Sequence, residues 1–127
     1  MADGRVKFIP FIESQSELFG IFRTARLLVF PSTVEAMSMV LLEAASLEVP
    51  IVCSDIPENK SVLHERAIFF QAGDASDLTA KLRWALDHPK ELKKLAQSAA
   101  GWVREAYSWD SIAHRYENLY CAARGPR

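Results

Sequence analysis

Short apolar runs alternate with helical repeats along the chain. Four runs rich in β-branched and aromatic residues predict strands, at Val6–Phe11, Leu27–Phe30, Pro50–Cys53 and Ala67–Phe70. Between them, apolar residues recur at three- and four-residue spacing, which predicts helices over Ser14–Ala25, Ser38–Leu47 and Glu58–His64. Short, wholly apolar strands that alternate with helices are typical of a parallel sheet covered on both faces. The pattern therefore predicts an α/β, Rossmann-like fold with about four mostly parallel strands flanked by helices.

After the fourth apolar run, the pattern predicts helices only, so the C-terminal third is expected to be helical. One helix is expected over Asp77–Asp87, and Pro89 suits the first turn of the next. Ser108 is placed to cap a last helix. The apolar residues that we expect to face inward on this helix are Ile112, Ala113, Tyr116, Leu119 and Tyr120.

The composition is that of a globular domain, and it argues against several classes of function. The 127 residues are predicted to form a single domain (1–127), and 15 Lys and Arg nearly balance 16 Asp and Glu, unlike a nucleic-acid-binding domain. Cys53 and Cys121 lie far apart and lack the closely spaced ligands of a zinc site, so no metal is expected. No apolar stretch is long enough for a membrane span, and the N-terminus does not read as a signal peptide. The cysteine usage is typical of free thiols and predicts a cytoplasmic chain, while peripheral contact with a membrane stays open.

Two glutamates stand at places that are unusual for structural residues. Glu43 lies in the middle of an otherwise apolar predicted helix, where a buried carboxylate costs free energy unless it is paired. Glu35 lies in the loop between a strand and that helix, where open α/β sheets bind ligands. The helix N-terminus suits a phosphate, and a carboxylate further along can accept hydrogen bonds from a ribose. The alternative is that Glu43 pairs with a Lys or Arg, or faces solvent.

The segment around these glutamates resembles the signature of retaining glycosyltransferases with the GT-B fold (group 1, family 4). That signature has two glutamates separated by seven residues, and the positions that match it are Pro31, Ser32, Glu35, Glu43, Ala44, Pro50, Val52, Ser54 and Asp55. The similarity continues to Gly73-Asp74 and Tyr107-Ser-Trp109, and it covers about residues 6–121. The resemblance implies the C-terminal, donor-binding domain of an enzyme that transfers a sugar from a nucleotide-sugar to an acceptor with retention.

The resemblance also implies what each residue of the signature does. Glu43 is expected to bind the ribose hydroxyls of the nucleotide-sugar, and Glu35 the donor sugar. Backbone N–H groups of the four residues after Glu35 are expected to contact the sugar and phosphates, and these are Ala36, Met37, Ser38 and Met39. A hydrolase-type acid–base pair is the alternative role for the two glutamates, and the resemblance disfavours it.

Several positions depart from the family pattern. Ala36 and Ser38 replace glycines that let the backbone approach a ligand closely, and Glu48 replaces a turn glycine. The family's Arg/Lys pair, which neutralises the leaving diphosphate, has no equivalent before Val6. The acceptor-binding domain is also not represented. We therefore predict a truncated donor-binding domain without a complete catalytic set and with negligible transferase activity on its own.

Three functions stay open at this point. The first is the donor domain of a glycosyltransferase, the second is a non-catalytic nucleotide-sugar-binding subunit that completes an enzyme with a partner chain, and the third is a ligand-free structural remnant. The strands Val6–Phe11 and Leu27–Phe30 are expected either to pair directly or to leave an edge that another chain covers. The resemblance implies that the last helix normally packs across the acceptor domain, so its face with Trp109, Tyr116 and Tyr120 is a candidate open face that would favour a homo-oligomer. Asp55 follows a strand and is placed to cap the next helix.

Overall fold

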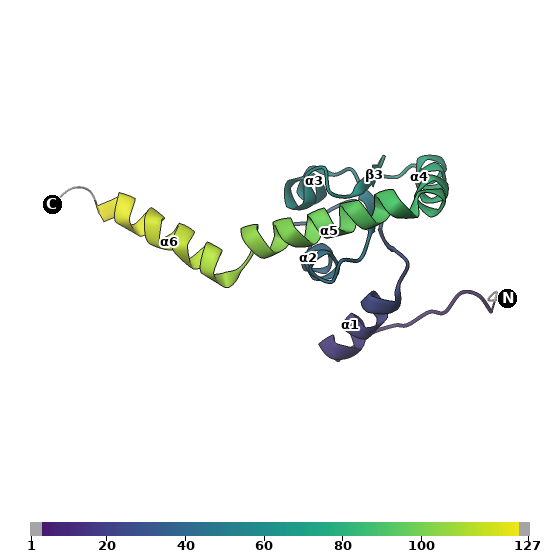
Figure 1. The fold of residues 1–127 in the computed structure, drawn as a ribbon, viewed down its shortest axis with the longest axis horizontal. Helices are drawn as coiled ribbons and strands as arrows, with labels where there is room; N and C mark the ends of the chain where they lie inside the picture. Colours follow the sequence, from purple (N-terminus) through teal and green to yellow (C-terminus); the bar gives the residue numbers. More distant parts are fainter. Residues whose placement is uncertain (1–3, 125–127) are drawn as a thin grey trace.

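The structure, a computed structural model, describes residues 4–124 and contains three strands and six helices in that range. The strands are β1 (Leu28–Phe30), β2 (Ile51–Ser54) and β3 (Ile68–Phe70). The helices are α1 (Gln15–Thr24), α2 (Met39–Ser46), α3 (Pro57–Leu63), α4 (Ala75–Asp87), α5 (Pro89–Ala106) and α6 (Trp109–Arg124). The predicted α/β fold is confirmed, and Figure 1 shows α2, α3, α4 and α5 gathered around the sheet while α6 projects from the body.

The three strands are parallel, and β2 lies between β1 and β3. The register pairs Val29 with Val52 and Cys53 with Phe69. Every residue of β2 is buried, as expected for a central strand with helices on both faces. The shared direction brings the carboxyl ends of all three strands to one edge of the sheet. Loops at this edge are where open α/β sheets bind ligands.

Two clusters of apolar side chains hold the helices against the two faces of the sheet. Because side chains alternate along a strand, Ile51 and Cys53 join a cluster with α2, α3 and α5, whereas Val52 joins β3, α4 and the start of α5. Leu41 in α2 is fully buried in the first cluster. In contrast, α1 contributes only Phe22 as a buried residue. The centre of the domain is therefore more firmly packed than α1.

The predicted strand over Val6–Phe11 is wrong, and the sheet has three strands rather than four. Residues 6–11 have no regular secondary structure, and the side chains of Phe8 and Phe11 are 83% and 77% exposed. β-branched and aromatic residues report a local preference, but a strand also needs a backbone partner for its N–H and C=O groups. Within residues 4–124, β1 pairs with β2 alone, so the direct pairing considered for this segment does not occur.

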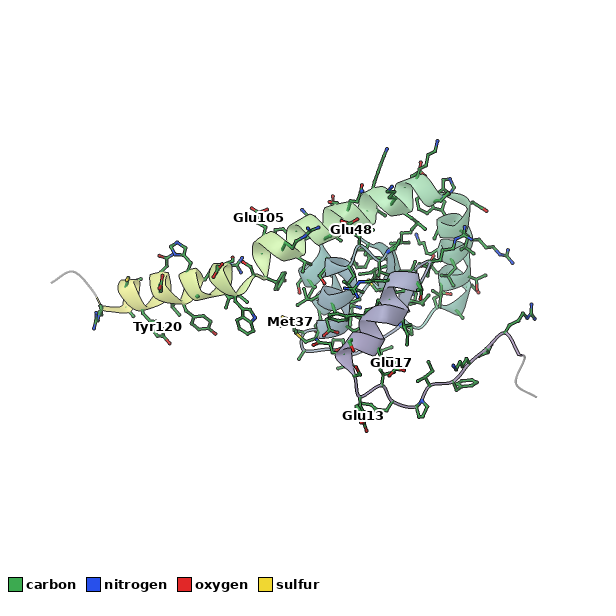
Figure 2. The ribbon with its side chains drawn as sticks, turned by 60° about the horizontal axis from the view of Figure 1, so that its bottom comes forward. Glu13, Glu17, Met37, Glu48, Glu105 and Tyr120 are labelled. Atoms are coloured by element: carbon green, nitrogen blue, oxygen red, sulfur yellow. The ribbon has the colours of Figure 1, made fainter. Side chains whose placement is uncertain are left out.

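The last helix forms where it was predicted, but the prediction that its apolar face points inward is wrong. The Oγ of Ser108 accepts a hydrogen bond from the N–H of Ser111 at 3.1 Å, so the predicted cap is confirmed. No residue of α6 is buried, and Trp109 and Tyr120 are 85% and 67% exposed. The helix extends away from the body in Figures 1 and 2, so its apolar periodicity has no opposing layer there. Within residues 4–124, no helix has the length and apolar character needed to cross a bilayer.

Candidate functional site

The candidate site comprises the loop between β1 and α2 and the first turns of α2. The strand ends at Phe30, and the chain then passes through Glu35 to Ser38, which caps the helix. Ser38 is buried, and its Oγ accepts a hydrogen bond from the N–H of Leu41 at 3.4 Å. The helix begins at Met39, one residue after the predicted start at Ser38. The loop therefore leaves the carboxyl edge of the sheet and enters a helix N-terminus directly.

The backbone N–H groups of residues 36–40 donate no hydrogen bond to any residue that the structure describes. They belong to the end of the loop and the first turn of α2, where N–H groups have no intrahelical acceptor. The helix dipole adds partial positive charge at the same end. Ala36, Met37 and Met39 are exposed. This end of the helix can therefore donate hydrogen bonds to an anion from solvent.

The loop does not need the glycines expected from the family resemblance. Among the described non-glycine residues, only Glu48 and His64 have a positive φ, of 58° and 51°. Ala36 and Ser38 therefore adopt backbone conformations that are open to any L-residue, and Ser38 supplies a capping oxygen that glycine lacks. Glu48 differs, because it has the left-handed backbone conformation that favours glycine. Its carboxylate lies 3.5 Å from the guanidinium of Arg104.

Glu43 lies on the least buried face of α2. Its neighbours Leu42 and Ala44 are buried, whereas Met39, four residues earlier on the same face, is exposed. A rise of about 1.5 Å per residue places Glu43 about 6 Å along the helix axis from Met39. Side chains in a helix lean back toward its N-terminus. The half-buried carboxylate is therefore directed toward the turn that carries the unpaired N–H groups.

Glu43 has a polar partner that the sequence analysis missed. The Nε2 of Gln15, in the first turn of α1, donates a hydrogen bond to the Oε1 of Glu43 at 3.2 Å. No ion pair in the described chain joins Glu43 to a Lys or Arg. A carboxylate offers about four acceptor positions, and Gln15 uses one of them. Because 28 positions separate the two residues, no local sequence signal could have identified this contact.

Glu35 is held by a side chain from its own loop. The Oγ of Ser32 donates a hydrogen bond to the Oε1 of Glu35 at 2.7 Å, and it lies 3.0 Å from the carbonyl oxygen of Val34. Within the described chain, no hydrogen bond joins Glu35 to Glu43, so each carboxylate has its own partner. The site therefore offers one hydrogen-bond-accepting carboxylate before the unpaired N–H groups and one after them.

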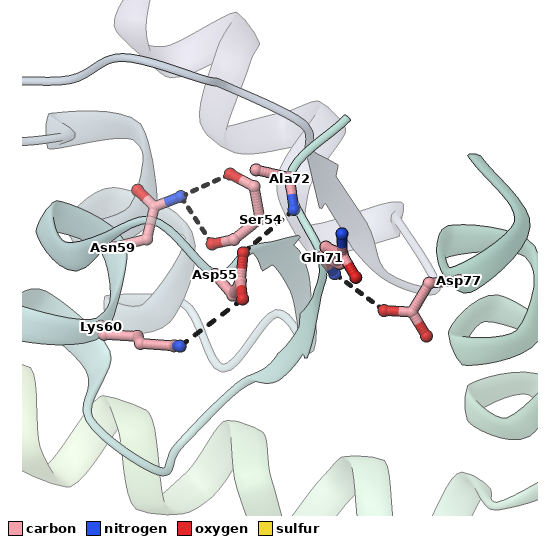
Figure 3. A network of polar contacts seen from close by, with 7 residues as sticks. All are labelled: Ser54, Asp55, Asn59, Lys60, Gln71, Ala72 and Asp77. Atoms are coloured by element: carbon pink, nitrogen blue, oxygen red, sulfur yellow. Dashed lines mark hydrogen bonds and ion pairs between the residues drawn. The ribbon is translucent and has the colours of Figure 1, made fainter. Parts of the chain in front are cut away.

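A second set of contacts ties together the loops at the carboxyl edge of the sheet (Figure 3). Asp55, just after β2, accepts a hydrogen bond from the N–H of Ala72 at 3.0 Å and lies 3.7 Å from the Nζ of Lys60. The Ala72 N–H, assisted by the charge of Lys60, lowers the pKa of the Asp55 carboxyl below its ordinary value of 3.8. The prediction that Asp55 caps the next helix is wrong. The N-cap of α3 is Ile56, and its side chain makes no cap hydrogen bond, because the Asp55 carboxylate is directed to the loop after β3.

The two glutamates do not line the larger cavity described here, so cavity size does not identify the candidate site. A cavity of about 710 Å³ lies against α3 and α5, lined by residues that include His64, Arg66 and Ser98. Neither Glu35 nor Glu43 lines it. A smaller cavity of about 220 Å³ opens between the loops that follow β1 and β3. The two glutamates and the unpaired N–H groups instead belong to a partly exposed surface, so their hydrogen-bonding capacity is what marks this region.

Comparison with known proteins identifies the family of the chain. Residues 2–118 match the family model described as glycosyl transferases, group 1. The chain belongs to this family. It is 32% identical over 110 residues to an MMP alpha-(1->4)-mannosyltransferase of Mycolicibacterium hassiacum, a match that covers 84% of this chain and 27% of that protein. It is also 32% identical over 119 residues to a glycogen synthase of Mycobacterium tuberculosis, covering 88% of this chain and 28% of the relative. This group 1 glycosyltransferase domain therefore spans less than a third of the length of these two relatives.

The fold of the group 1 domain also matches a solved glycosyltransferase structure. Sucrose-phosphate synthase from Thermosynechococcus elongatus superposes with a TM-score of 0.79 over 94% of this chain and 30% of the synthase, at 23% identity. The match confirms the predicted fold, which is that of a domain from a GT-B glycosyltransferase. The relatives differ in the sugars and products that they are named for, so family membership leaves the particular sugar unspecified.

Proposed function

We propose that this domain binds the nucleotide-sugar donor of a glycosyltransferase on the surface formed by the β1–α2 loop and the start of α2. The observation that carries the proposal is the run of unpaired N–H groups over residues 36–40, preceded by Glu35 and followed by Glu43. A diphosphate needs hydrogen-bond donors, whereas ribose and hexose hydroxyls can donate to carboxylates. A nucleotide-sugar presents both kinds of group in the matching order.

Each residue then has a role in the proposed complex. Glu43 accepts hydrogen bonds from the ribose hydroxyls, with Gln15 holding one of its oxygens. Glu35 accepts hydrogen bonds from the donor sugar. The backbone N–H groups of Ala36, Met37, Ser38 and Met39 contact the sugar and the diphosphate. This assignment is supported by the half-buried position of both carboxylates and by the exposure of the loop between them.

The proposed reaction is sugar transfer to an acceptor with retention at the anomeric carbon, and we propose that this chain alone binds the donor without turning it over. Departure of the sugar leaves negative charge on the diphosphate, and stabilisation of such charge is usually the main contribution to catalysis. Within the described chain, the ion pairs involve Asp55, Glu48 and Glu117, and none involves the loop around Glu35. A transfer assay with radiolabelled nucleotide-sugar should show no turnover by the purified chain; robust turnover would contradict this part of the proposal.

Calorimetric titration of the 127-residue chain with UDP, GDP, UDP-glucose and GDP-mannose tests donor binding directly. We expect at least one of the two nucleotides to bind, together with its nucleotide-sugar. Glu43→Ala should weaken that binding by at least about tenfold, because it removes hydrogen bonds to a charged acceptor worth about 1.5–3 kcal/mol each. Glu105→Ala is the matched control, because Glu105 is an exposed glutamate on α5. Absence of binding by all four ligands, or equal effects of the two substitutions, would reject the proposed function.

A further inference from the structure

A chain of buried polar groups leads from α3 to the loop that carries Glu35. Asn59 in α3 is fully buried, at 0% exposure. Its Nδ2 donates to the carbonyl oxygen of Ser54 at 3.1 Å and to the Oγ of Ser54 at 3.0 Å (Figure 3). The Oγ of Ser54 in turn donates a hydrogen bond to the carbonyl oxygen of Ser32. Ser32 is the residue whose hydroxyl donates to Glu35.

The direction of these hydrogen bonds is fixed by the chemistry of the amide. Both hydrogens of the Asn59 Nδ2 are used on Ser54, so the Ser54 hydroxyl accepts from Asn59 and can donate its own hydrogen only onward, to Ser32. Rotation of the amide would place its Oδ1 against the carbonyl oxygen of Ser54, two acceptors facing each other. The Oδ1 of Asn59 is the buried side-chain oxygen that has no partner in the described chain. The Asn59 amide therefore keeps its Nδ2 directed at Ser54, even though this orientation leaves the buried Oδ1 without a hydrogen bond, which costs free energy.

We propose that Ser54 and Asn59 are positioning residues for Glu35, an inference that rests on the proposed role of Glu35 in binding the donor sugar. Ser32 is the connecting residue, because its carbonyl oxygen is held by Ser54 while its hydroxyl holds the Glu35 carboxylate. Ser54 is fully buried at the end of the central strand. The Ser54 hydrogen bond thus fixes the loop against the rigid core of the domain. Such support keeps a binding group, here the Glu35 carboxylate, in place before its ligand arrives.

The position of Ser54 supports a role beyond packing. The other residues of β2 are Ile51, Val52 and Cys53, all apolar and buried. An apolar residue at the fourth position would fill the same core without any polar group to satisfy. Ser54 instead brings a hydroxyl to the carboxyl edge of the sheet, beside the β1–α2 loop. The polar pair therefore lies where the core meets the candidate donor site.

The test compares Ser54→Ala and Ser32→Ala with the matched control Ser61→Ala in the full 127-residue chain. Ser61 lies on the exposed side of α3, and its hydroxyl bonds only to the carbonyl oxygen of Glu58. Calorimetry with UDP-glucose and GDP-mannose should show that Ser54→Ala and Ser32→Ala weaken nucleotide-sugar binding by about tenfold. Binding of UDP and GDP should be unchanged, because Glu35 faces the sugar and not the nucleotide. Ser61→Ala should change neither.

A second readout separates positioning from general damage to the fold. In a Glu35→Ala background, Ser54→Ala should cause no further loss of nucleotide-sugar affinity, because residues that act through one another are not additive. Equal losses for nucleotide and nucleotide-sugar, or additive losses in the double variant, would overturn the inference while leaving the proposed function standing.

A third measurement needs no ligand. NMR order parameters of the amides of residues 33–35 should fall in Ser54→Ala and stay unchanged in Ser61→Ala. If the unaltered chain bound no nucleotide-sugar, the proposed function would fail, and these order parameters would still decide whether Ser54 holds the loop. Unchanged order in Ser54→Ala would reject the positioning role in either case.

Discussion

Truncation of Phe22 should release α1 from the body of the domain without unfolding the rest. Phe22 is the only buried residue of α1, at 6% exposure, while Leu18 and Phe19 pack beside it and are only partly buried. Phe→Ala substitution at a buried site costs about 3–5 kcal/mol. A helix of 10 residues has little stability of its own in water. α1 is therefore held by this side chain more than by any other single contact.

The size of the effect follows from what remains after the substitution. The exposed hydrogen bond between Gln15 and the charged Glu43 contributes at most about 1.5–3 kcal/mol, and the partly buried Leu18 and Phe19 each contribute less than the roughly 1.5–3 kcal/mol of a fully buried side chain. A loss of about 3 kcal/mol raises the undocked population of α1 about a hundredfold. Global unfolding of a domain costs about 5–15 kcal/mol, so undocking of α1 becomes the easier transition.

Native-state amide hydrogen exchange measures this directly. In Phe22→Ala, protection of the α1 amides should fall about a hundredfold, whereas amides of β2 and α2 should change much less. Ile21→Ala is the control on the same helix, because Ile21 is 38% exposed and its loss should leave α1 docked. If protection in α1 and β2 fell by the same factor in Phe22→Ala, α1 would be part of the global folding unit and the reasoning would be refuted.

Three further predictions concern other residues. Burial raises the pKa of the Cys53 thiol to about 12, so iodoacetamide should modify the exposed Cys121 and leave Cys53 unmodified until the chain unfolds, as mass spectrometry would show. The Asp55 pKa is lowered in the folded state, so its contribution to stability is present above the ordinary value of 3.8 and is lost as the pH falls through the folded pKa; Asp55→Asn should reduce that loss in urea titrations. Glu48→Gly removes a left-handed glutamate and should raise the free energy of unfolding by up to about 1 kcal/mol, with Arg104→Ala reporting the separate effect of the ion pair.

The sequence predicted those parts of the site that depend on neighbouring residues. The helix predicted from Ser38 begins one residue later, with Ser38 as its cap, because a serine stands directly before an apolar helical repeat. The central strand was predictable because Ile51, Val52 and Cys53 are suited to a position buried on both faces, whereas Ser54 lay outside the predicted strand. Contacts between distant segments were not predictable in the same way. Gln15 reaches Glu43 across 28 positions, and Asn59 lies in a helix of 7 residues, too short to reveal by periodicity which of its polar residues is buried.

The two wrong predictions of burial have one physical cause. A periodic apolar pattern shows that one face of an element is apolar, but burial of that face requires a second apolar surface packed against it. For α2 both surfaces lie within the described chain, because α2 packs against α5 and the sheet. For Val6–Phe11 and for the apolar face of α6, no opposing layer is present in residues 4–124, and their large side chains remain exposed.

The difference in packing between the centre of the domain and α1 determines how far donor binding should depend on α1. The loop from Ser32 to Ser38 is held by Ser54, Asn59 and the cap of α2, all within the firmly packed centre. Among the described residues, the hydrogen bond that joins α1 to the proposed site is the one between Gln15 and Glu43. Release of α1 by Phe22→Ala should therefore weaken nucleotide-sugar binding by no more than Gln15→Ala does, even though the first change is far more damaging to the helix. A much larger loss in Phe22→Ala, measured by the same calorimetry, would show that α1 supports the donor site through contacts other than Gln15.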